Sequence, residues 1–126
     1  MALAIGLGAF GAHLLEKPLA EWYTEPVVQE RMRQIWETAV KYQGMQAAGI
    51  IMFGLWLERR PQSTTSLTPA ILFLGSLIFS GSLYVLVISG QRWLGAIVPI
   101  GGALMMLGWG AWAWMAWREP RNEKHT

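Results

Sequence analysis

Two long apolar runs in the second half of the chain constrain the fold most. Residues 67–88 and 93–117 carry no charged side chain, and the joint between them reads only Ser-Gly-Gln-Arg-Trp. Each run exceeds the roughly 20 apolar residues that cross the hydrocarbon core of a bilayer as a helix. Because the joint is so short, the two helices have to run antiparallel. The sequence therefore predicts a transmembrane helical hairpin.

Composition agrees with a membrane protein and excludes several kinds of site. The chain has 126 residues, of which 53% are hydrophobic and 14% charged, whereas about a quarter of the residues are charged in ordinary soluble domains. The net charge of +2 is too small to indicate a nucleic-acid partner. There is no cysteine and no aspartate, so disulfides, thiolate chemistry and zinc–thiolate sites are excluded. We expect one membrane domain with no metal site and no cofactor.

The first apolar segment, residues 2–15, is open to three interpretations. It covers about 22 Å as a helix, which is short of a hydrocarbon core of about 30 Å. It is a signal peptide, a short or tilted span, or the end of a longer natural helix that begins upstream of Met1. We favour a span retained in the mature protein, because a basic leading region is missing. Ala4, Gly8 and Ala12 recur every four residues and predict a face that a neighbouring helix can approach closely.

The middle of the chain predicts an amphipathic helix followed by a second span. Residues 16–24 are polar, and Pro18 is expected to end any helix that continues into them from the first apolar segment. Residues 26–37 alternate apolar and charged side chains with helical period, which fits a helix lying in the membrane interface or one packed on the bundle. The predicted fold is all-α: a bundle of four transmembrane helices, with this interfacial helix between the first and second spans. The four spans are 2–15, 38–57, 67–88 and 93–117, and a charged tail follows at 118–126.

Aromatic and basic residues flank the predicted spans. Trp93 opens the fourth span and Trp117 closes it, as expected for an interfacial aromatic belt. The two faces of the membrane would carry equal numbers of basic residues, but those at 59–60 and 118–124 lie close to the ends of predicted spans. This favours a cytoplasmic location for both termini.

Four sequence blocks carry a resemblance to a known family. They are Gly8–His13, Trp36–Gln43, Phe79–Tyr84 (Phe-Ser-Gly-Ser-Leu-Tyr), and Leu94-Gly95 followed by Pro99 and Gly108-Trp109. Their order and spacing resemble the domain-of-unknown-function 423 family, the YgdD-like small proteins of the bacterial inner membrane, which have mitochondrial relatives in animals. The resemblance implies a four-helix, multi-pass membrane protein and brings no established activity.

The chain departs from that family at two places. Family members usually carry a histidine where Gln46 stands, so a role for a titrating imidazole there is in doubt. Their first helix also usually extends further upstream of the Gly8–His13 block.

Five polar residues form the best candidate site. Amides and hydroxyls in hydrocarbon need hydrogen-bond partners, and the predicted helices offer them to one another. The cluster is structural, tying helices together, or it lines a ligand pocket. Its members are His13, Gln43, Gln46, Ser80 and Tyr84.

Small residues and one proline are predicted to shape helix packing. Glycines let neighbouring helices approach, and a proline inside the fourth span is expected to kink it. The residues are Gly8, Gly75, Gly81, Pro99, Gly101 and Gly102.

Three classes of function remain after these exclusions. The first is a non-enzymatic accessory, assembly or stabilising subunit that packs against other membrane proteins or itself. The second is a small channel or carrier, with Ser76, Ser80, Tyr84 and the two glutamines lining a pore or pocket. The third is an enzyme acting on lipids, for which only His13, Glu16 and Lys17 lie near the interface, and these form no recognisable triad.

Overall fold

The computed structural model describes residues 1–59 and 67–118, and every regular element in this part of the chain is helical. This confirms the predicted all-α class. The predicted tail beyond Arg118 lies outside the described residues. In chain order the elements are α1 (Ala2–His13), α2 (Glu16–Trp22), α3 (Pro26–Glu58), α4 (Thr68–Ser89), the 3₁₀ helix η1 (Arg92–Ala96) and α5 (Val98–Arg118).

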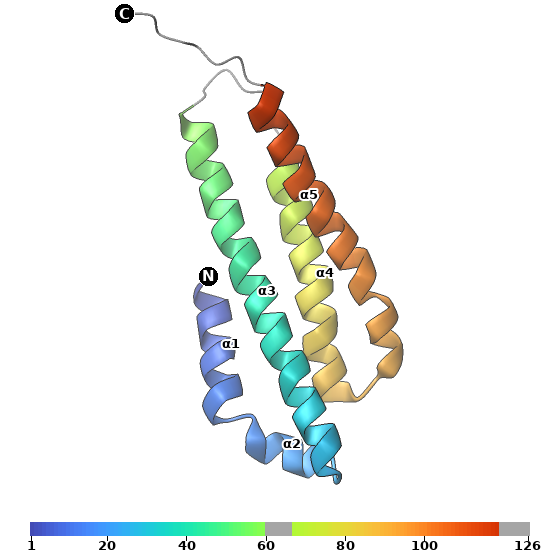
Figure 1. Cartoon of the computed structure of the whole chain (residues 1–126). Helices are drawn as coiled ribbons and strands as arrows, with labels where there is room; N and C mark the ends of the chain where they lie inside the picture. The colour runs from blue at the N-terminus through green and yellow to red at the C-terminus, as the bar shows by residue number, and fades with distance from the viewer. Residues whose placement is uncertain (60–66, 119–126) are drawn as a thin grey trace, which may run out of the picture.

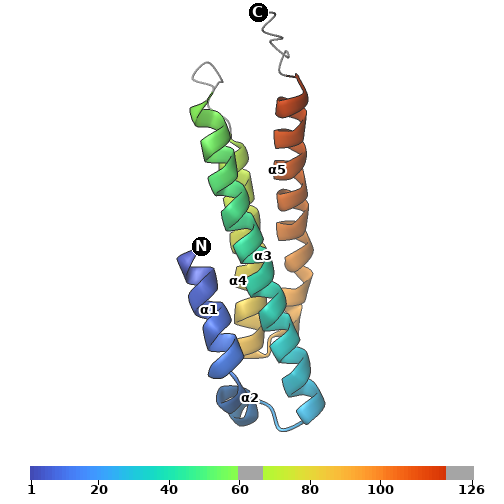
Figure 2. The ribbon, with the colours of Figure 1, turned by 60° about the vertical axis from the view of Figure 1, so that its left-hand side comes forward.

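The long helices lie side by side (Figure 1). α4 packs against both α3 and α5, and α1 packs on α3. The bottom of Figure 1, formed by α2, the start of α3 and η1, is called the lower end below. The upper end is formed by the last turns of α3 and α5. Figure 2 shows that α1 runs beside only the lower half of α3.

The predicted hairpin is present as α4 and α5. Two stretches, Thr68–Ser89 and Arg92–Arg118, are long and apolar enough to cross a membrane, and α1 is a shorter apolar helix. With 22 residues, α4 is about 33 Å long, enough to cross a hydrocarbon core of about 30 Å.

The predicted boundary between an interfacial helix at 26–37 and a span at 38–57 is wrong. α3 runs without interruption from Pro26 to Glu58. No glycine or proline stands near Glu37 to end a helix, and Trp36 and Ala39, on either side of the predicted boundary, are both buried. The apolar face of the amphipathic segment therefore continues directly into the second long helix.

Two expectations about prolines are also wrong. Pro18 does not end a helix but lies in the first turn of α2, where its missing N–H is not needed. Pro99 is the second residue of α5, because the predicted fourth span is divided into η1 and α5. It therefore occupies a helix start instead of kinking a helix interior.

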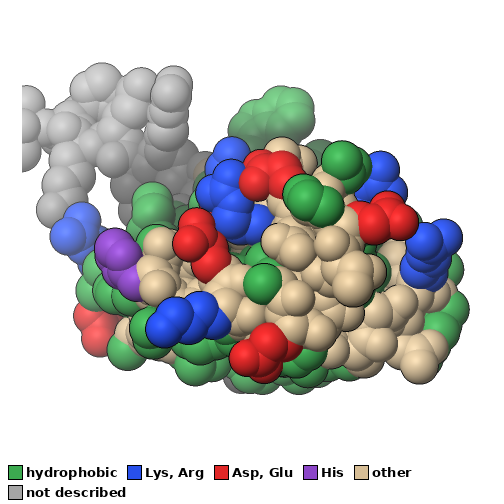
Figure 3. Space-filling model, turned by 90° about the horizontal axis from the view of Figure 1, so that it is seen from below, with side chains coloured by type: hydrophobic (Ala, Val, Ile, Leu, Met, Phe, Trp, Pro, Cys, Tyr) green, Lys and Arg blue, Asp and Glu red, His purple; other side chains and the backbone are tan. Residues whose placement is uncertain are grey.

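The lower end holds a compact apolar core. Leu15 and Leu19 from the α1–α2 region belong to one buried cluster with Trp36 of α3 and Val87 of α4. The Tyr23 hydroxyl donates a 2.8 Å hydrogen bond to the Val87 carbonyl, and burial raises the pKa of this hydroxyl. Charged side chains surround this core on the outer surface of the lower end (Figure 3).

Candidate functional site

Trp36 anchors α1 on α3. Its indole Nε1 donates a 2.9 Å hydrogen bond to the Leu7 carbonyl, and its ring lies against those of Phe10 and Tyr84. A Cβ added at Gly11 would lie 2.6 Å from the indole ring, so only glycine fits there. The predicted stripe Ala4–Gly8–Ala12 is correct for its first two members, but the helical period brings Gly11 onto α3 and leaves Ala12 exposed.

Two residues of the predicted polar cluster tie α4 to α3. The Ser80 hydroxyl donates to the Ala39 carbonyl at 2.8 Å and is buried. The Tyr84 hydroxyl donates to Gln43 Oε1 at 2.7 Å. Each of these hydroxyls donates its proton within the chain, which is the arrangement expected of polar contacts that join helices.

Gln46 turns to a different helix. Its Oε1 accepts a 3.0 Å hydrogen bond from the indole Nε1 of Trp109 on α5, while its residue surface is only 5% exposed. Gln46 follows Gln43 by three positions, so the two side chains point about 60° apart around α3. This rotation directs Gln43 to Tyr84 on α4 and Gln46 to Trp109 on α5.

His13 lies apart from the other four residues. It is exposed at the end of α1, and α1 runs antiparallel to α3, so that Gly11 faces Trp36 whereas Ala4 faces Gly44. The level of Gln43 along α3 is therefore that of Ala4, nine residues or about 13 Å of helical rise from His13. The structure brings Gln43, Ser80 and Tyr84 together, places Gln46 beside Trp109, and leaves His13 at the lower end.

The predicted packing glycines divide into close contacts and open positions. A Cβ added at Gly101 would lie 2.5 Å from the Phe79 backbone nitrogen, and one at Gly75 2.8 Å from Met105 Cγ, so α4 and α5 cross here almost backbone to backbone. At Gly8 the nearest atom is Val40 Cγ1 at 3.2 Å. Gly102 meets the Phe79 ring at ordinary contact distance, and Gly81 meets nothing within 4 Å.

Sequence reasoning missed two further close contacts of glycine. A Cβ added at Gly49 would lie 2.5 Å from the Trp109 indole, and one at Gly108 2.6 Å from Leu72 Cδ2. Gly108 follows Gly101 by seven residues, a heptad spacing that repeats one helix face. No sequence spacing marks Gly49 as a packing residue, because its neighbour Trp109 lies on a helix about sixty residues later in the chain.

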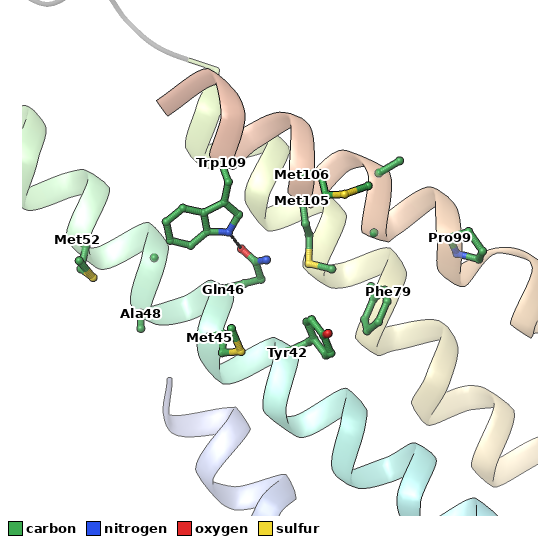
Figure 4. A pocket seen from close by; sticks show the side chains of 13 residues that line it. Tyr42, Met45, Gln46, Ala48, Met52, Phe79, Pro99, Met105, Met106 and Trp109 are labelled. Atoms are coloured by element: carbon green, nitrogen blue, oxygen red, sulfur yellow. Dashed lines mark hydrogen bonds between the residues drawn. The ribbon is translucent and has the colours of Figure 1, made fainter. Parts of the chain in front are cut away.

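A trough with a volume of about 860 Å³ lies between α3 and α5. We call it the α3–α5 trough (Figure 4). Its floor includes Phe79 of α4, and Gln46 supplies its amide. The lining residues are Tyr42, Met45, Gln46, Ala48, Gly49, Met52, Phe79, Pro99, Gly102, Ala103, Met105, Met106 and Trp109.

Aromatic rings close the upper end of the trough. Trp109 stacks on Trp112 with ring centres 5.2 Å apart, and Trp112 meets Phe53 edge to face at 5.3 Å. Phe53 is fully buried. The Trp112 ring therefore joins α5 to α3.

The lower end carries a polar network that resembles no catalytic site. Arg33 pairs with Glu30 at 2.8 Å and with Glu37 at 3.1 Å. Hydrogen bonds from Arg33 and Gln34 hold the pKa of the Glu30 carboxyl below its usual value. All of these groups are partly or largely exposed, and within residues 1–59 and 67–118 no group of three or more potential ligands is placed to hold a metal ion.

Comparison with known proteins assigns the family. The model of the family described as "Protein of unknown function (DUF423)" matches residues 7–102. The chain belongs to the DUF423 family. A UPF0382 membrane protein of Staphylococcus haemolyticus is 41% identical over 107 residues, covering 85% of this chain and 80% of the relative.

Other relatives carry similar names. The UPF0382 membrane protein YwdK of Bacillus subtilis is 38% identical over 109 residues, covering 85% of this chain and 80% of the relative. The UPF0382 inner membrane protein YgdD of Escherichia coli K12 is 31% identical over 106 residues, covering 83% and 73%. No solved structure matches. The DUF423 chain described here is therefore a member of a family of bacterial membrane proteins of unknown function, as its sequence blocks predicted.

Proposed function

We propose that this DUF423 protein is a four-span protein of the bacterial inner membrane that acts without catalysis, as an accessory, assembly or stabilising subunit. In this proposal it packs through outward-facing glycines against other membrane proteins or copies of itself.

The observation that carries the proposal is a set of glycines at which an added Cβ would meet no described residue within 4 Å. They are Gly6, Gly54, Gly81 and Gly110, and they lie on α1, α3, α4 and α5. Glycine in a helix interior costs roughly 1 kcal/mol relative to alanine, and at these positions no close contact with the described residues offsets that cost. Close approach of another helix in the bilayer would supply the missing contact.

The charge pattern supports four spans. No charged residue lies between Lys41 and Glu58 on α3, and none lies between Thr68 and Ser89 on α4. The 12 residues of α1 cover about 18 Å, so this helix spans only where the bilayer thins around it. In this arrangement α3 and α5 end on the same side, which we assign to the cytoplasm from Arg59 and Arg118 at their ends.

A non-enzymatic role agrees with how the polar groups are used. Ser80 and Tyr84 make hydrogen bonds within the bundle. His13 and Lys17 are exposed at the lower end. Glu16 lines a hollow of about 350 Å³ there, in which Arg33 is already paired with Glu30. The alternative of a channel or carrier finds less support, since two of the three hydroxyls proposed to line its path, those of Ser80 and Tyr84, donate to the chain itself. Solute flux through reconstituted vesicles that Ser80→Leu abolishes would favour that alternative.

The proposal is tested by the mass of the particle extracted in a mild detergent or directly in native nanodiscs. We expect a particle larger than the 14.1 kDa chain with its detergent or lipid. Leucine at Gly54 or Gly110 should break the complex while leaving the helix content intact, whereas Ile100→Leu, on another exposed part of α5, should leave it whole. A particle that stays monomeric at membrane-like concentrations would overturn the proposal.

A further inference from the structure

The α3–α5 trough exposes a hydrogen-bond donor of a buried residue that has no partner among the described residues. Gln46 uses its Oε1 for Trp109, and no hydrogen bond from its Nε2 to any described residue is present. Since no enclosed side-chain nitrogen or oxygen among the described residues lacks a partner, this nitrogen must open onto the trough. Figure 4 shows it directed away from Trp109, into the space between the lining side chains.

The depth of Gln46 selects the kind of acceptor it can meet. Counted from Lys41, the last charged residue before the uncharged part of α3, Gln46 lies about 8 Å further along the helix. A hydrocarbon core is about 30 Å thick, so the amide lies inside the hydrocarbon, below the headgroups. The ester carbonyls of ordinary phospholipids stay near the headgroups. An occupant must carry its own acceptor into the apolar layer, because an amide N–H without a partner is costly there.

The dimensions of the trough favour a small molecule over a helix. Its walls run from Tyr42 to Met52 on α3 and from Pro99 to Trp109 on α5, about 15 Å in each case. A transmembrane helix needs a groove about 30 Å long. The trough is shorter, because the contact of Trp112 with Phe53 bridges α3 and α5 above its upper end. Pockets for small molecules measure about 300–1,000 Å³, and the trough, at about 860 Å³, falls within that range.

The lining favours a planar ring. The rings of Tyr42 and Phe79 are 4.8 Å apart at the lower part of the trough, and the Trp109 indole bounds the upper part. Flat π systems stack well on such rings. Methionine side chains, including those of Met45 and Met106, adapt to irregular shapes and contact aromatic edges favourably.

We propose that the α3–α5 trough binds a lipid with a planar, carbonyl-bearing ring and an apolar tail, which is the chemistry of an isoprenoid quinone. The Gln46 amide donates a hydrogen bond from Nε2 to a ring carbonyl, and the ring lies among Tyr42, Phe79 and Trp109. The tail leaves through the open side of the trough into the bilayer. This binding site is separate from the outward-facing glycines proposed to contact other proteins.

The probe for this site is a radiolabelled benzoquinone with a decyl tail, titrated into the protein in lipid nanodiscs as a mole fraction of the bilayer. We expect saturable binding of one quinone per chain. Unlabelled decylbenzene, which has the same tail and a ring without carbonyls, should not displace it. Gln46→Met should weaken binding about fivefold, the usual effect of one neutral hydrogen bond.

A matched pair of variants on α5 keeps the test decisive if Gln46→Met does not fold. Gly102→Leu directs a larger side chain past Phe79 into the trough, and its first carbon fits at 3.8 Å from that ring. It should lower the affinity at least tenfold. Gly110→Leu adds the same side chain to the same helix where nothing lies within 4 Å, and should bind the quinone normally.

Several results would overturn the proposal. These are quinone uptake that never saturates, equal binding by the Gly102 and Gly110 variants, and equally tight binding of decylbenzene. Photocrosslinks from the trough to a second polypeptide that excludes the quinone would instead make it a protein-docking groove. Loss of the protein complex in Gly110→Leu without loss of quinone binding would show that the two proposals stand independently.

Discussion

At the scale of single residues, glycine position decides how closely α4 and α5 approach. The Cβ of any larger residue at Gly101 would meet backbone atoms of Phe79 and Gly75, which cannot rotate away as a flexible side chain does. Gly75 and Gly101 were predictable as packing residues because both lie in long apolar helices. Gly11 and Gly49 were not, because their need for glycine comes from tryptophans whose ring positions depend on the tertiary fold.

Gly101→Ala is expected to destabilise the protein by about 1–3 kcal/mol, the usual range for overpacking a well-filled contact. The matched control is Gly110→Ala on the same helix, which meets open space and should be neutral or stabilising by up to about 1 kcal/mol through helix propensity. Denaturation in detergent, followed by circular dichroism, measures both. Equal stability of the two variants would contradict the close crossing of α4 and α5.

Tyr23→Phe tests the contact between the α2–α3 connection and the end of α4. It removes the donor to the Val87 carbonyl and should cost about 0.5–1.5 kcal/mol. The folded-state pKa of Tyr23 is raised above its ordinary value of 10.0, so the folded chain keeps this proton at a pH where the unfolded chain has lost it. The associated stabilisation is complete below pH 10 and is lost as the pH rises through the folded pKa.

Unfolding measured between pH 8 and pH 11 checks the sign of this effect. The difference in stability between the unaltered protein and Tyr23→Phe should shrink as the pH rises above about 10, the ordinary tyrosine pKa. The other tyrosines, Tyr42 and Tyr84, are present in both proteins and cancel in the difference. A difference that grows with pH would contradict the burial of the Tyr23 hydroxyl.

At the scale of elements, the sequence predicts the helices better than their limits. The hairpin of α4 and α5 follows from two uncharged runs and a joint too short for any other connection. The continuity of α3 was missed because charge changes near Lys41, and a change in charge was read as a change of element. Backbone continuity depends instead on helix-ending residues, and none stands there. Pro18 and Pro99 were read as residues that end or kink a helix, but each lies in the first turn of one.

Thr38→Pro tests whether α3 is continuous. In one uninterrupted helix, a proline at this position loses a backbone hydrogen bond and clashes with the preceding turn, which costs about 3 kcal/mol or more. If two helices met here, the same proline would be tolerated. Val27→Pro is the matched control, because residue 27 lies in the first turn of α3 beside Pro26 and is 73% exposed. Thermal unfolding should separate the two variants clearly.

At the scale of the whole molecule, the sequence predicts a bundle but not its open side. The apolar runs indicate how many helices pack, whereas the α3–α5 trough exists because α4 separates α3 from α5 until the aromatic contacts near Trp112 join them. The five-residue polar cluster was divided for a related reason. Gln43 and Gln46 are close in sequence, but the rotation of α3 directs one toward Tyr84 and the other toward Trp109.

The proposed topology is testable because the chain has no cysteine, so that each introduced thiol reports one position. Gln91→Cys marks the turn between α4 and η1, and Arg59→Cys marks the end of α3 at the opposite end of the molecule. Both positions are exposed. With the upper end in the cytoplasm, a membrane-impermeant maleimide added to intact spheroplasts should label residue 91 at once, and residue 59 only after permeabilisation.

Leu77→Cys provides the control for depth. Residue 77 lies near the middle of α4 and is 59% exposed in the isolated chain, so in a bilayer its thiol faces hydrocarbon, where the thiolate that reacts with maleimide is disfavoured. It should stay unlabelled until detergent is added. Labelling of residue 59 from outside and residue 91 only from inside would reverse the orientation but keep the spans. Labelling of both from the same side would mean that α4 does not cross the membrane, and the four-span arrangement would be wrong.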